Sequence, residues 1–359
     1  MKIALLSYST KPRGGVVHTL ALAEALAALG EDVTVWTLGR GGDAGFFRPV
    51  APAVRLRIVP FPDGPPEESV GARILRSIAV LRDAFDPTPY DVVHAQDCIS
   101  ANAVDGRCVR TVHHIDHFTT PELAACHERA LVEPRAHICV SRAVADELAT
   151  GWGLSAEVIP NGVAYDRFAA TDPAARANWS SLLGRYVLTI GGIEPRKGSL
   201  DLLEAYALLR TAHPGVRLVI AGGETLFDYR DYRARWEARA AELDAQPVVL
   251  GQVRDAELPS LVAAAAAFAF PSVKEGFGLA AMEALAAGVP LVVRELPVLR
   301  EVFDGAARFA ATPRDLAGEL DAALTQENPA HRAAGRNLAA RHTWTSAARH
   351  HLAFYRSLD

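Results

Sequence analysis

Short runs of Val, Ile and Leu alternate with longer segments of helical periodicity along most of the chain. This alternation is typical of parallel β-sheets with helices on both faces, so the sequence predicts an α/β fold. In the first half it predicts strands at Lys2–Leu6, Asp32–Thr37, Arg55–Val59, Asp91–His94, Arg107–Val112 and His137–Val140. Apolar residues at helical spacing predict a helix over Val16–Leu29, between the first two strands.

The strand pattern restarts after a polar stretch and predicts a second winding unit. Its strands are expected at Tyr186–Ile190, Arg217–Ala221, Pro247–Leu250, Ala267–Phe270 and Leu291–Val293. The stretch from Asp166 to Gly184 contains Asp-Pro and few β-branched residues, which predicts a linker. A chain of 359 residues is also too long for one ordinary core. We therefore expect two Rossmann-like, doubly wound domains.

The predicted boundaries are residues 1–168 for the first domain, 169–342 for the second and 343–359 for a final helix. The tail carries Trp344, Leu352, Phe354 and Tyr355, which is too apolar for a free end. We expect this helix to cross over and pack back on the N-terminal domain. Ligands of doubly wound sheets bind beyond the carboxyl ends of the strands, so we expect a central cleft between the domains.

Composition and charge exclude several classes of protein. Half of the residues are hydrophobic, which is typical of a globular chain. The net charge is −5 and no basic run is present, so the sequence does not predict binding to nucleic acid. The four cysteines form no C-x-x-C pair and are expected to be reduced. The first apolar run, Met1–Leu6, is a strand too short for a signal peptide, so a cytoplasmic location is expected.

A membrane-spanning helix is not expected either. The longest apolar run, Leu261–Phe270, is well short of the roughly 20 residues that a spanning helix needs. Peripheral contact with a membrane stays compatible with the sequence, because an amphipathic face touches lipid without a long apolar run.

The strongest chemical motif is P-S-V-K-E-G-F-G-L-A-A-M-E, residues 271–283, directly after the predicted strand Ala267–Phe270. It places a glycine-rich loop at the start of a helix, where free N–H groups suit a diphosphate. Glu275 in the loop and Glu283 in the helix are placed to meet the hydroxyls of a sugar and a ribose. The alternative is that Glu283 is a solvated helix residue and that Glu275 only favours the helix start.

A second motif, G-G-I-E-P-R-K-G at residues 191–198, follows the strand Tyr186–Ile190 and opens a helix over Ser199–Leu209. The planar guanidinium of Arg196 and the compact ammonium charge of Lys197 suit the stabilisation of a departing diphosphate. Taken alone, such a basic pair is more often structural or solvating.

Two further motifs lie in the first half. Gly14-Gly15 leads into the first helix but lacks the G-x-G-x-x-G spacing of a dinucleotide site. The segment T-V-H-H-I-D-H, residues 111–117, ends a predicted strand, where catalytic side chains tend to lie. Its histidines have no nearby Cys or Asp that completes a tetrahedral set, so a metal site is not expected.

Together these motifs carry a resemblance. The run E-G-F-G-L-x-x-M-E-A-L-A-x-G-x-P resembles the E-x7-E signature of the retaining glycosyltransferase family 4, which has the GT-B fold. The segment I-P-N-G-V at residues 159–163 is similar to a further family motif. The resemblance covers nearly the full length and is most specific in the C-terminal half. It implies a hexose-type transfer from a nucleotide-diphosphate-sugar donor, with retention and without metal or other cofactor.

The resemblance also implies roles for particular residues. It implies catalytic roles for His113, Glu275, Arg196 and Lys197. It implies donor binding by Gly15, Arg196, Lys197, Glu275, Gly276, Phe277, Gly278, Leu279 and Glu283. Gly192 stands where the family usually has arginine, and we expect Arg196 to supply that charge; His114 replaces a frequent aspartate. His94 matches a position near the acceptor, although a hydrogen-bonded core histidine is an equal alternative.

The acceptor implied is a hydroxyl group on a small molecule, a glycan or a lipid. UDP-, GDP- and ADP-sugars are all compatible with the motifs, because pocket shape decides the base. Other functions stay open: a nucleotide-sugar epimerase of GT-B fold, or a non-catalytic module that binds a sugar or a partner. The missing G-x-G-x-x-G counts against a nicotinamide-dependent oxidoreductase.

Overall fold

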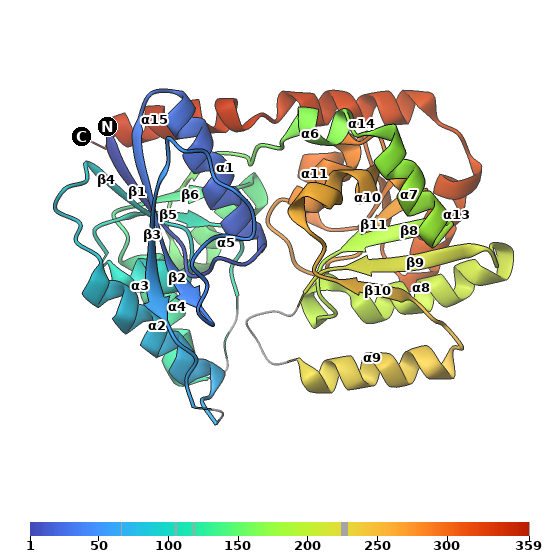
Figure 1. Ribbon diagram of the computed structural model, residues 1–359, viewed down its shortest axis with the longest axis horizontal. Coiled ribbons are helices and arrows are strands. Elements are labelled where there is room, and N and C mark those ends of the chain that lie inside the picture. Colours follow the sequence, from blue (N-terminus) through green and yellow to red (C-terminus); the bar gives the residue numbers. More distant parts are fainter. Residues whose placement is uncertain (66, 105, 117, 119, 224–228, 359) are drawn as a thin grey trace. The chain divides into compact units, whose positions relative to one another are not determined.

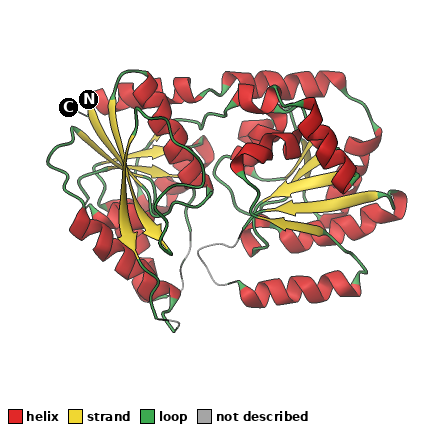
Figure 2. Ribbon diagram, in the orientation of Figure 1, coloured by secondary structure: helices red, strands yellow, loops and turns green. Residues whose placement is uncertain are grey.

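The computed structural model describes residues 1–65, 67–104, 106–116, 118, 120–223 and 229–358. The chain forms two compact units, and each has one parallel sheet flanked by helices (Figure 1 and Figure 2). Unit 1 contains residues 1–162 together with the C-terminal segment from Trp344, and unit 2 contains Val163–Thr343. The predicted α/β class with two Rossmann-like units is confirmed.

The described part of unit 1 has a seven-stranded sheet in the order β3-β2-β1-β4-β5-β6-β7, and every pairing is parallel. The strands are β1 Lys2–Leu6, β2 Asp32–Arg40, β3 Arg55–Phe61, β4 Val92–Ala95, β5 Val109–Val112, β6 Ala136–Cys139 and β7 Glu157–Val158. The chain winds outwards from β1 in one direction and from β4 in the other. The β1–β4 pair is thus a topological switch point.

Helices cover both faces of this sheet. They are α1 Gly14–Ala28, α2 Val70–Ala84, α3 Cys98–Ala103, α4 Pro121–Val132, α5 Arg142–Trp152 and α15 Trp344–Arg356. Ile3 and Leu5 are fully buried with α1 and α15 on one face, whereas Ala4 and Leu6 are fully buried on the other. Burial on both faces explains why the strand sequences are continuous apolar runs.

The described part of unit 2 has a six-stranded sheet in the order β10-β9-β8-β11-β12-β13, again with parallel pairings. The strands are β8 Arg185–Ile190, β9 Val216–Ala221, β10 Val248–Gly251, β11 Ala267–Phe270, β12 Leu291–Arg294 and β13 Arg308–Ala310. Each strand that the periodicity predicts is present in one of the two sheets. The short strands β7 and β13 were not predicted, because two or three residues show no recognisable period.

The helices of unit 2 include two in the segment that the sequence predicts to be a linker. The α-helices are α6 Tyr165–Ala169, α7 Pro173–Leu183, α8 Ser199–Ala212, α9 Arg230–Glu242, α10 Leu258–Ala264, α11 Leu279–Ala286, α12 Pro297–Phe303, α13 Pro313–Thr325 and α14 Pro329–Arg341. Short 3-10 helices are η1 Pro195–Lys197 and η2 Asp255–Glu257.

The prediction of a linker from Asp166 to Gly184 is wrong, because most of this segment lies in α6 and α7. Asp172 caps α7, its side chain accepting from the N–H groups of Ala174 and Ala175, and Pro173 has the backbone angle of a first helical residue.

The unit boundary lies between Gly162 and Val163, somewhat before the predicted boundary at residue 168. The difference arises because α6 follows the boundary and belongs to unit 2. The C-terminal segment from Trp344 belongs to unit 1, where α15 lies beside α1 (Figure 1). Tyr355 and Ala348 of α15 are fully buried there. No helix in the described ranges is long and apolar enough to span a bilayer.

Candidate functional site

Two loops of unit 2 follow the neighbouring strands β8 and β11, and both leave the sheet at its carboxyl end. The β8 loop is residues 191–198 and the β11 loop is residues 271–278. The chain winds away from this pair of strands in both directions, so the pair is a topological switch point. Ligands of doubly wound sheets bind at such a point. The two predicted phosphate-binding motifs therefore lie side by side.

The two loops pack tightly against each other. The backbone N–H of Val273 donates to the carbonyl of Arg196 at 2.8 Å. Gly198 adopts φ 64°, and a Cβ at this position would collide with the carbonyl oxygen of Pro271. A glycine is required here both for its left-handed backbone and for the close approach of the second loop.

The carboxylate of Glu275 lies between two cations from the β8 loop. Its Oε2 is 3.1 Å from Nζ of Lys197 and 3.5 Å from Nη1 of Arg196. Arg196 is also 3.5 Å from the buried carboxylate of Glu194. Burial lowers the pKa of Lys197, while the nearby Glu275 carboxylate opposes that shift. The structure thus brings together three of the four residues with predicted catalytic roles.

Lys197 is held in place by its surroundings as well as by its charge. Gly191 lies against its methylene stem, because a Cβ added to Gly191 would approach the Cγ, Cδ and Cε atoms to 3.2–3.3 Å. The ammonium lies over the ring of Phe270 at 5.2 Å from the ring centre. The missing side chain at Gly191 therefore makes room for Lys197, and Phe270 at the end of β11 supports it.

The β11 loop ends where α11 begins. Gly278 is the N-cap of α11 with φ 100°, and a Cβ there would press on the buried ring of Phe303. No side chain from the described residues caps this helix start, so its first N–H groups are open to an anion. Phe277 is 3% exposed, so its side chain is not available to a ligand. Gly276 is also buried, and Leu279 is half-buried at the first helical position.

Glu283 lies in α11 and is half-buried. Burial raises the pKa of Glu283 to about 7; Arg167 partly opposes the shift and Asp255 adds to it. Arg167 itself is paired with Asp255 at 2.9 Å. A carboxyl group with this burial and pKa does not fit the alternative of a solvated helix residue.

In unit 1 the glycine loop and the predicted histidine come together. A Cβ added to Gly15 would lie 3.6 Å from the ring of His113, whereas Gly14 faces open space. Burial lowers the pKa of His113 well below its usual value, and the positive charge of Arg110 adds to this shift. The Nε2 atom of His113 is buried without a hydrogen-bond partner among the described residues. His113 is therefore a neutral ring with unused hydrogen-bonding capacity beside Gly15.

Sequence reasoning missed two histidines that surround His113. The ring of His18 from α1 is 4.8 Å from that of His113 and 6.1 Å from that of His351 in α15. Nδ1 of His18 lies 2.8 Å from Oδ1 of Asn161, and Nδ1 of His351 lies 2.8 Å from the carbonyl of Ala347. Because both partners are acceptors, Nδ1 carries the proton and Nε2 presents a lone pair. We call His18, His113 and His351 the histidine group.

His94 lies in the core of unit 1 and is 0% exposed. Its Nδ1 is 2.6 Å from the hydroxyl of Tyr355, and its Nε2 is 2.7 Å from the hydroxyl of Thr111. Both ring nitrogens are therefore used inside the unit. This placement favours the core interpretation of His94 over a contact with the acceptor.

Two further histidines belong to the histidine segment, His114 and His117. His114 lies 3.2 Å from Asp116, and His117 is outside the described residues. Across the ranges that the structure describes, no group of three His, Cys, Asp or Glu side chains could hold a metal ion.

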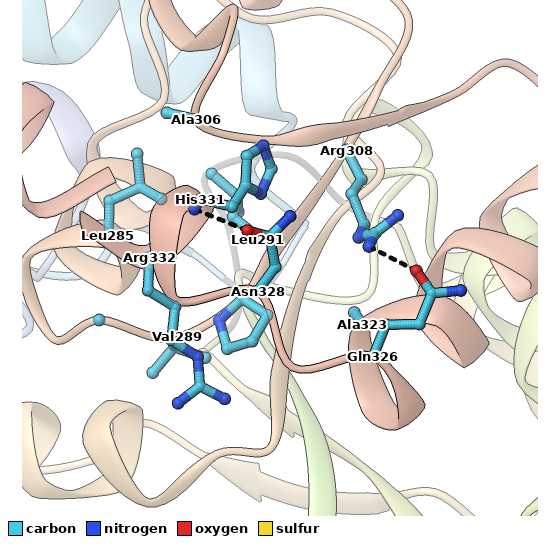
Figure 3. A pocket seen from close by; sticks show the side chains of 12 residues that line it. Leu285, Val289, Leu291, Ala306, Arg308, Ala323, Gln326, Asn328, His331 and Arg332 are labelled. Carbon is cyan, nitrogen blue, oxygen red and sulfur yellow. Dashed lines mark hydrogen bonds between the residues drawn. The ribbon is translucent and has the colours of Figure 1, made fainter. Parts of the chain in front are cut away.

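A pocket in unit 2 lies away from both loops. It lies at the amino ends of β12 and β13, and its lining combines apolar residues with polar residues that are partly bonded in pairs (Figure 3). Arg308 donates to Gln326 at 3.2 Å, and Asn328 accepts from the N–H of His331 at 2.9 Å as the cap of α14. These bonds serve the fold, so we do not place a ligand in this pocket.

Two family models match the chain, one mainly in unit 1 and the other within unit 2. Residues 12–167 match the model described as Glycosyltransferase Family 4. Residues 180–340 match the model described as Glycosyl transferases group 1. The second match contains both loops of unit 2, and the first contains Gly15 and the histidine segment.

Characterised relatives are similar over different lengths. A phosphatidyl-myo-inositol mannosyltransferase of Mycobacterium tuberculosis is 30% identical over 338 residues, covering 84% of this chain and 80% of the relative. A glycogen synthase of the same species is 31% identical over 358 residues, covering 89% and 84%. A GDP-mannose:cellobiosyl-diphosphopolyprenol alpha-mannosyltransferase of Komagataeibacter xylinus is 32% identical over 207 residues, covering 56% of this chain and half of that relative.

Solved structures share the fold. The Anabaena protein Alr3699/HepE, in complex with UDP and glucose, superposes with a TM-score of 0.76 at 20% identity, covering 99% of both chains. A sucrose-phosphate synthase from Thermosynechococcus elongatus gives a TM-score of 0.80 at 19% identity, covering 100% of this chain and 99% of the other. At these identities the likeness concerns the fold alone.

Proposed function

The chain belongs to the family-4 glycosyltransferases of the GT-B fold, and from this premise we propose that it is a retaining, metal-independent hexosyltransferase. Its donor is a nucleotide-diphosphate-sugar, and its acceptor is a hydroxyl group on a small molecule, a glycan or a lipid. One observation carries the proposal: Arg196 and Lys197 converge on Glu275 beside the uncapped start of α11.

The two cations and the helix start act on the diphosphate. Bond cleavage leaves negative charge on the departing phosphate, and Arg196 and Lys197 are fixed where they neutralise it. The N–H groups at Gly278 and Leu279 add the positive end of α11. These groups take the role that a divalent cation has in other enzymes, so transfer requires no bound metal.

The two glutamates bind hydroxyl groups. Glu275, held by Lys197, accepts hydrogen bonds from the sugar. Glu283 accepts from the ribose, in a buried environment where such a bond is worth more than in water. Fixing the donor at both ends orients the reacting carbon, which is the main contribution that a protein makes when it provides no nucleophile.

Unit 1 contributes neutral groups. His113 hydrogen-bonds a sugar hydroxyl without adding charge, because its pKa is well below its usual value. The Gly15 loop brings main-chain N–H groups close to that ring, since glycine has no side chain in the way. In this scheme the bond between the sugar carbon and the phosphate breaks, and the acceptor oxygen bonds to that carbon on the same face. The departing phosphate takes the proton of the acceptor hydroxyl.

A lipid acceptor would place the protein at a membrane surface. The names of two relatives support this option, since one acts on phosphatidyl-myo-inositol and another on a diphosphopolyprenol. We propose a cytoplasmic protein with peripheral membrane contact where the acceptor is a lipid.

The proposal is tested by a thermal-shift and hydrolysis screen of the purified protein against UDP-, GDP- and ADP-sugars. We expect stabilisation by one class of donor, together with slow release of the sugar, because transferases pass the sugar to water when no acceptor is present. Glu275→Ala is the site control, and Arg235→Ala on the exposed surface of α9 is the matched surface control.

The outcomes separate the candidate functions. Sugar release with retained anomeric configuration, seen by NMR and lost only in Glu275→Ala, supports the transferase. A changed sugar that stays attached to the nucleotide would indicate an epimerase. Donor binding without any turnover, even with a panel of acceptors, would contradict catalysis and indicate a binding module.

A further inference from the structure

Glu194 lies beside the two cations of the donor loops, and the proposed function gives it no role. It directly precedes the 3-10 helix η1, which carries Arg196 and Lys197. Its Oε1 atom is 3.5 Å from Nη2 of Arg196, and its side chain is only 8% exposed. A buried carboxylate is costly unless a group of opposite charge compensates it. The ion pair with Arg196 provides this compensation.

The main chain of Glu194 is fixed independently of its carboxylate. Its N–H donates to the hydroxyl of Ser199 at 3.3 Å, and that hydroxyl donates to the carbonyls of Glu194 and Gly192 at 3.3 and 3.4 Å. The N–H of Lys197 donates to the carbonyl of Glu194 at 3.2 Å and closes η1. On the side of Glu194, these bonds use only main-chain atoms. A neutral side chain of the same shape can therefore replace Glu194 without opening the loop.

The guanidinium of Arg196 lies between two carboxylates. Its Nη1 atom is 3.5 Å from Oε2 of Glu275, and its Nη2 atom is 3.5 Å from Oε1 of Glu194. In the proposed function, Glu275 also accepts hydrogen bonds from the donor sugar, so its oxygens are shared between substrate and cations. Glu194 has no such second task. It is the carboxylate that continues to hold Arg196 when Glu275 binds the sugar.

Lys197 and Arg196 differ in what holds them. The stem of Lys197 packs against Gly191, and its ammonium lies over the ring of Phe270. The side chain of Arg196 is 29% exposed, and an arginine has many rotamers in solvent. Its guanidinium keeps one orientation only where its charged end is fixed. The orientation of Arg196 therefore depends on its ion pairs.

We propose that Glu194 is a positioning residue, which holds the guanidinium of Arg196 against the departing diphosphate. A guanidinium has several N–H donors, so Nη2 can pair with Glu194 while other N–H groups bind phosphate oxygens. A cation that is fixed before the reaction stabilises the developing charge without a cost of reorganisation. Glu194 is itself negative and repels the diphosphate, so it acts through Arg196. This inference rests on the proposed function and adds a residue to it.

Hydrolysis of the donor by the whole protein tests the proposal. Wild type and Glu194→Gln are incubated with UDP-glucose, GDP-mannose and ADP-glucose, and kcat and KM are measured for the donor that is hydrolysed. Glu194→Gln keeps the shape of the side chain and removes its charge. Glu327→Gln, at an exposed position before α14, removes the same charge from the same unit as a control. Circular dichroism and thermal melting verify that each variant is folded.

We expect Glu194→Gln to lower kcat about 10- to 100-fold, because Arg196 loses its alignment with the phosphate. The KM for the donor should stay the same or fall, because the variant lacks a negative charge that repels the diphosphate. Glu327→Gln should have the kcat and KM of the wild type. A loop that is merely distorted would bind the donor less well, so a lower kcat with a higher KM would overturn the proposal.

A double-mutant cycle shows whether Glu194 acts through Arg196. In the background of Arg196→Ala, the further change Glu194→Gln is expected to leave kcat unchanged, because the group that Glu194 positions is absent. An equal loss of kcat in both backgrounds would show an action independent of Arg196 and would overturn the proposal.

Failure of the proposed function gives a different result. Normal hydrolysis by the wild type, with an unchanged kcat in folded Glu194→Gln, would refute only the role of Glu194. If the wild type hydrolyses none of the three donors, the result counts against the proposed function, and the role of Glu194 falls with it.

Discussion

The loops of unit 2 and the histidine group of unit 1 differ in their electrostatics. In unit 2, full charges are held against each other, with Glu275 between Lys197 and Arg196. In unit 1, His18, His113 and His351 have lowered pKa values and stay neutral at pH 7. The proposed function assigns different roles to the two regions. Under that proposal, the loops of unit 2 stabilise developing charge, and the histidine group orients hydroxyl groups without adding a charge.

The largest effect is expected from removing a cation of unit 2. Lys197→Ala should lower turnover by about 100- to 1,000-fold, because a preorganised charge beside the departing phosphate is lost. Glu275→Ala should lower turnover as well, while both variants keep the fold. Steady-state rates are compared with those of Arg235→Ala. If both rates stay at the wild-type level, the charged contact is not part of the chemistry.

Acid should destabilise unit 1 through its histidines. Burial lowers the pKa of His351 to about 4, so below about pH 6.5 the unfolded chain takes up a proton that the folded chain does not. This contribution to stability is present at neutral pH and is lost as the pH falls towards 4. His351→Gln should therefore reduce the loss of unfolding free energy between pH 7 and pH 4.5 by about 2 kcal/mol. Parallel pH profiles in urea melts of wild type and variant would contradict the neutral assignment.

The contact between the two loops of unit 2 should be sensitive to one methyl group. Gly198→Ala introduces a Cβ at φ 64° against the carbonyl of Pro271. We expect a loss of roughly 1–2 kcal/mol in unfolding free energy, measured by denaturant titration. Gly305→Ala is the control, because it has φ 73° with open space around the added atom. Equal losses in the two variants would show that the backbone angle alone matters, and not the contact between the loops.

The smallest effect concerns Glu283, which makes unit 2 respond to pH in the opposite sense. Its pKa of about 7 lies above its usual value, so the folded chain holds a proton that is lost as the pH rises through 7. Its contribution to stability is fully present below about pH 4.5 and is lost as the pH rises through 7. Glu283→Gln should therefore be about 1 kcal/mol more stable than the wild type at pH 8, with a smaller difference at pH 5.5. Thermal melts at both pH values check this, and a destabilised variant at pH 8 would contradict it.

The two regions also differ in how well the sequence predicts them. Lys197 and Glu275 lie in short motifs directly after predicted strands, and neighbouring parallel strands end at the same edge. Their proximity therefore follows from local patterns. His18 and His351 come from α1 and α15, near opposite ends of the chain, and no spacing links them. The apolar tail predicts α15, but the contact with α1 depends on packing.

Two errors have the same origin. The segment from Asp166 to Gly184 was predicted as a linker from its composition, although Asp172-Pro173 is also a helix-start signal. The grouping of His18 and His351 around His113 was not predicted, because the three residues lie in separate elements. Residues that cooperate across elements become visible only when the elements are placed.

The return of α15 to unit 1 has a consequence for biosynthesis. During translation, residues 1–162 leave the ribosome long before Trp344 is added, and unit 2 is made in between. Until then, the face of α1 that buries Ala348 and Tyr355 lacks its cover. The nascent first unit therefore exposes an apolar surface while the second unit is able to fold, and it is completed last. A fragment that ends before Trp344 would keep that surface open and is expected to depend on chaperones or to aggregate.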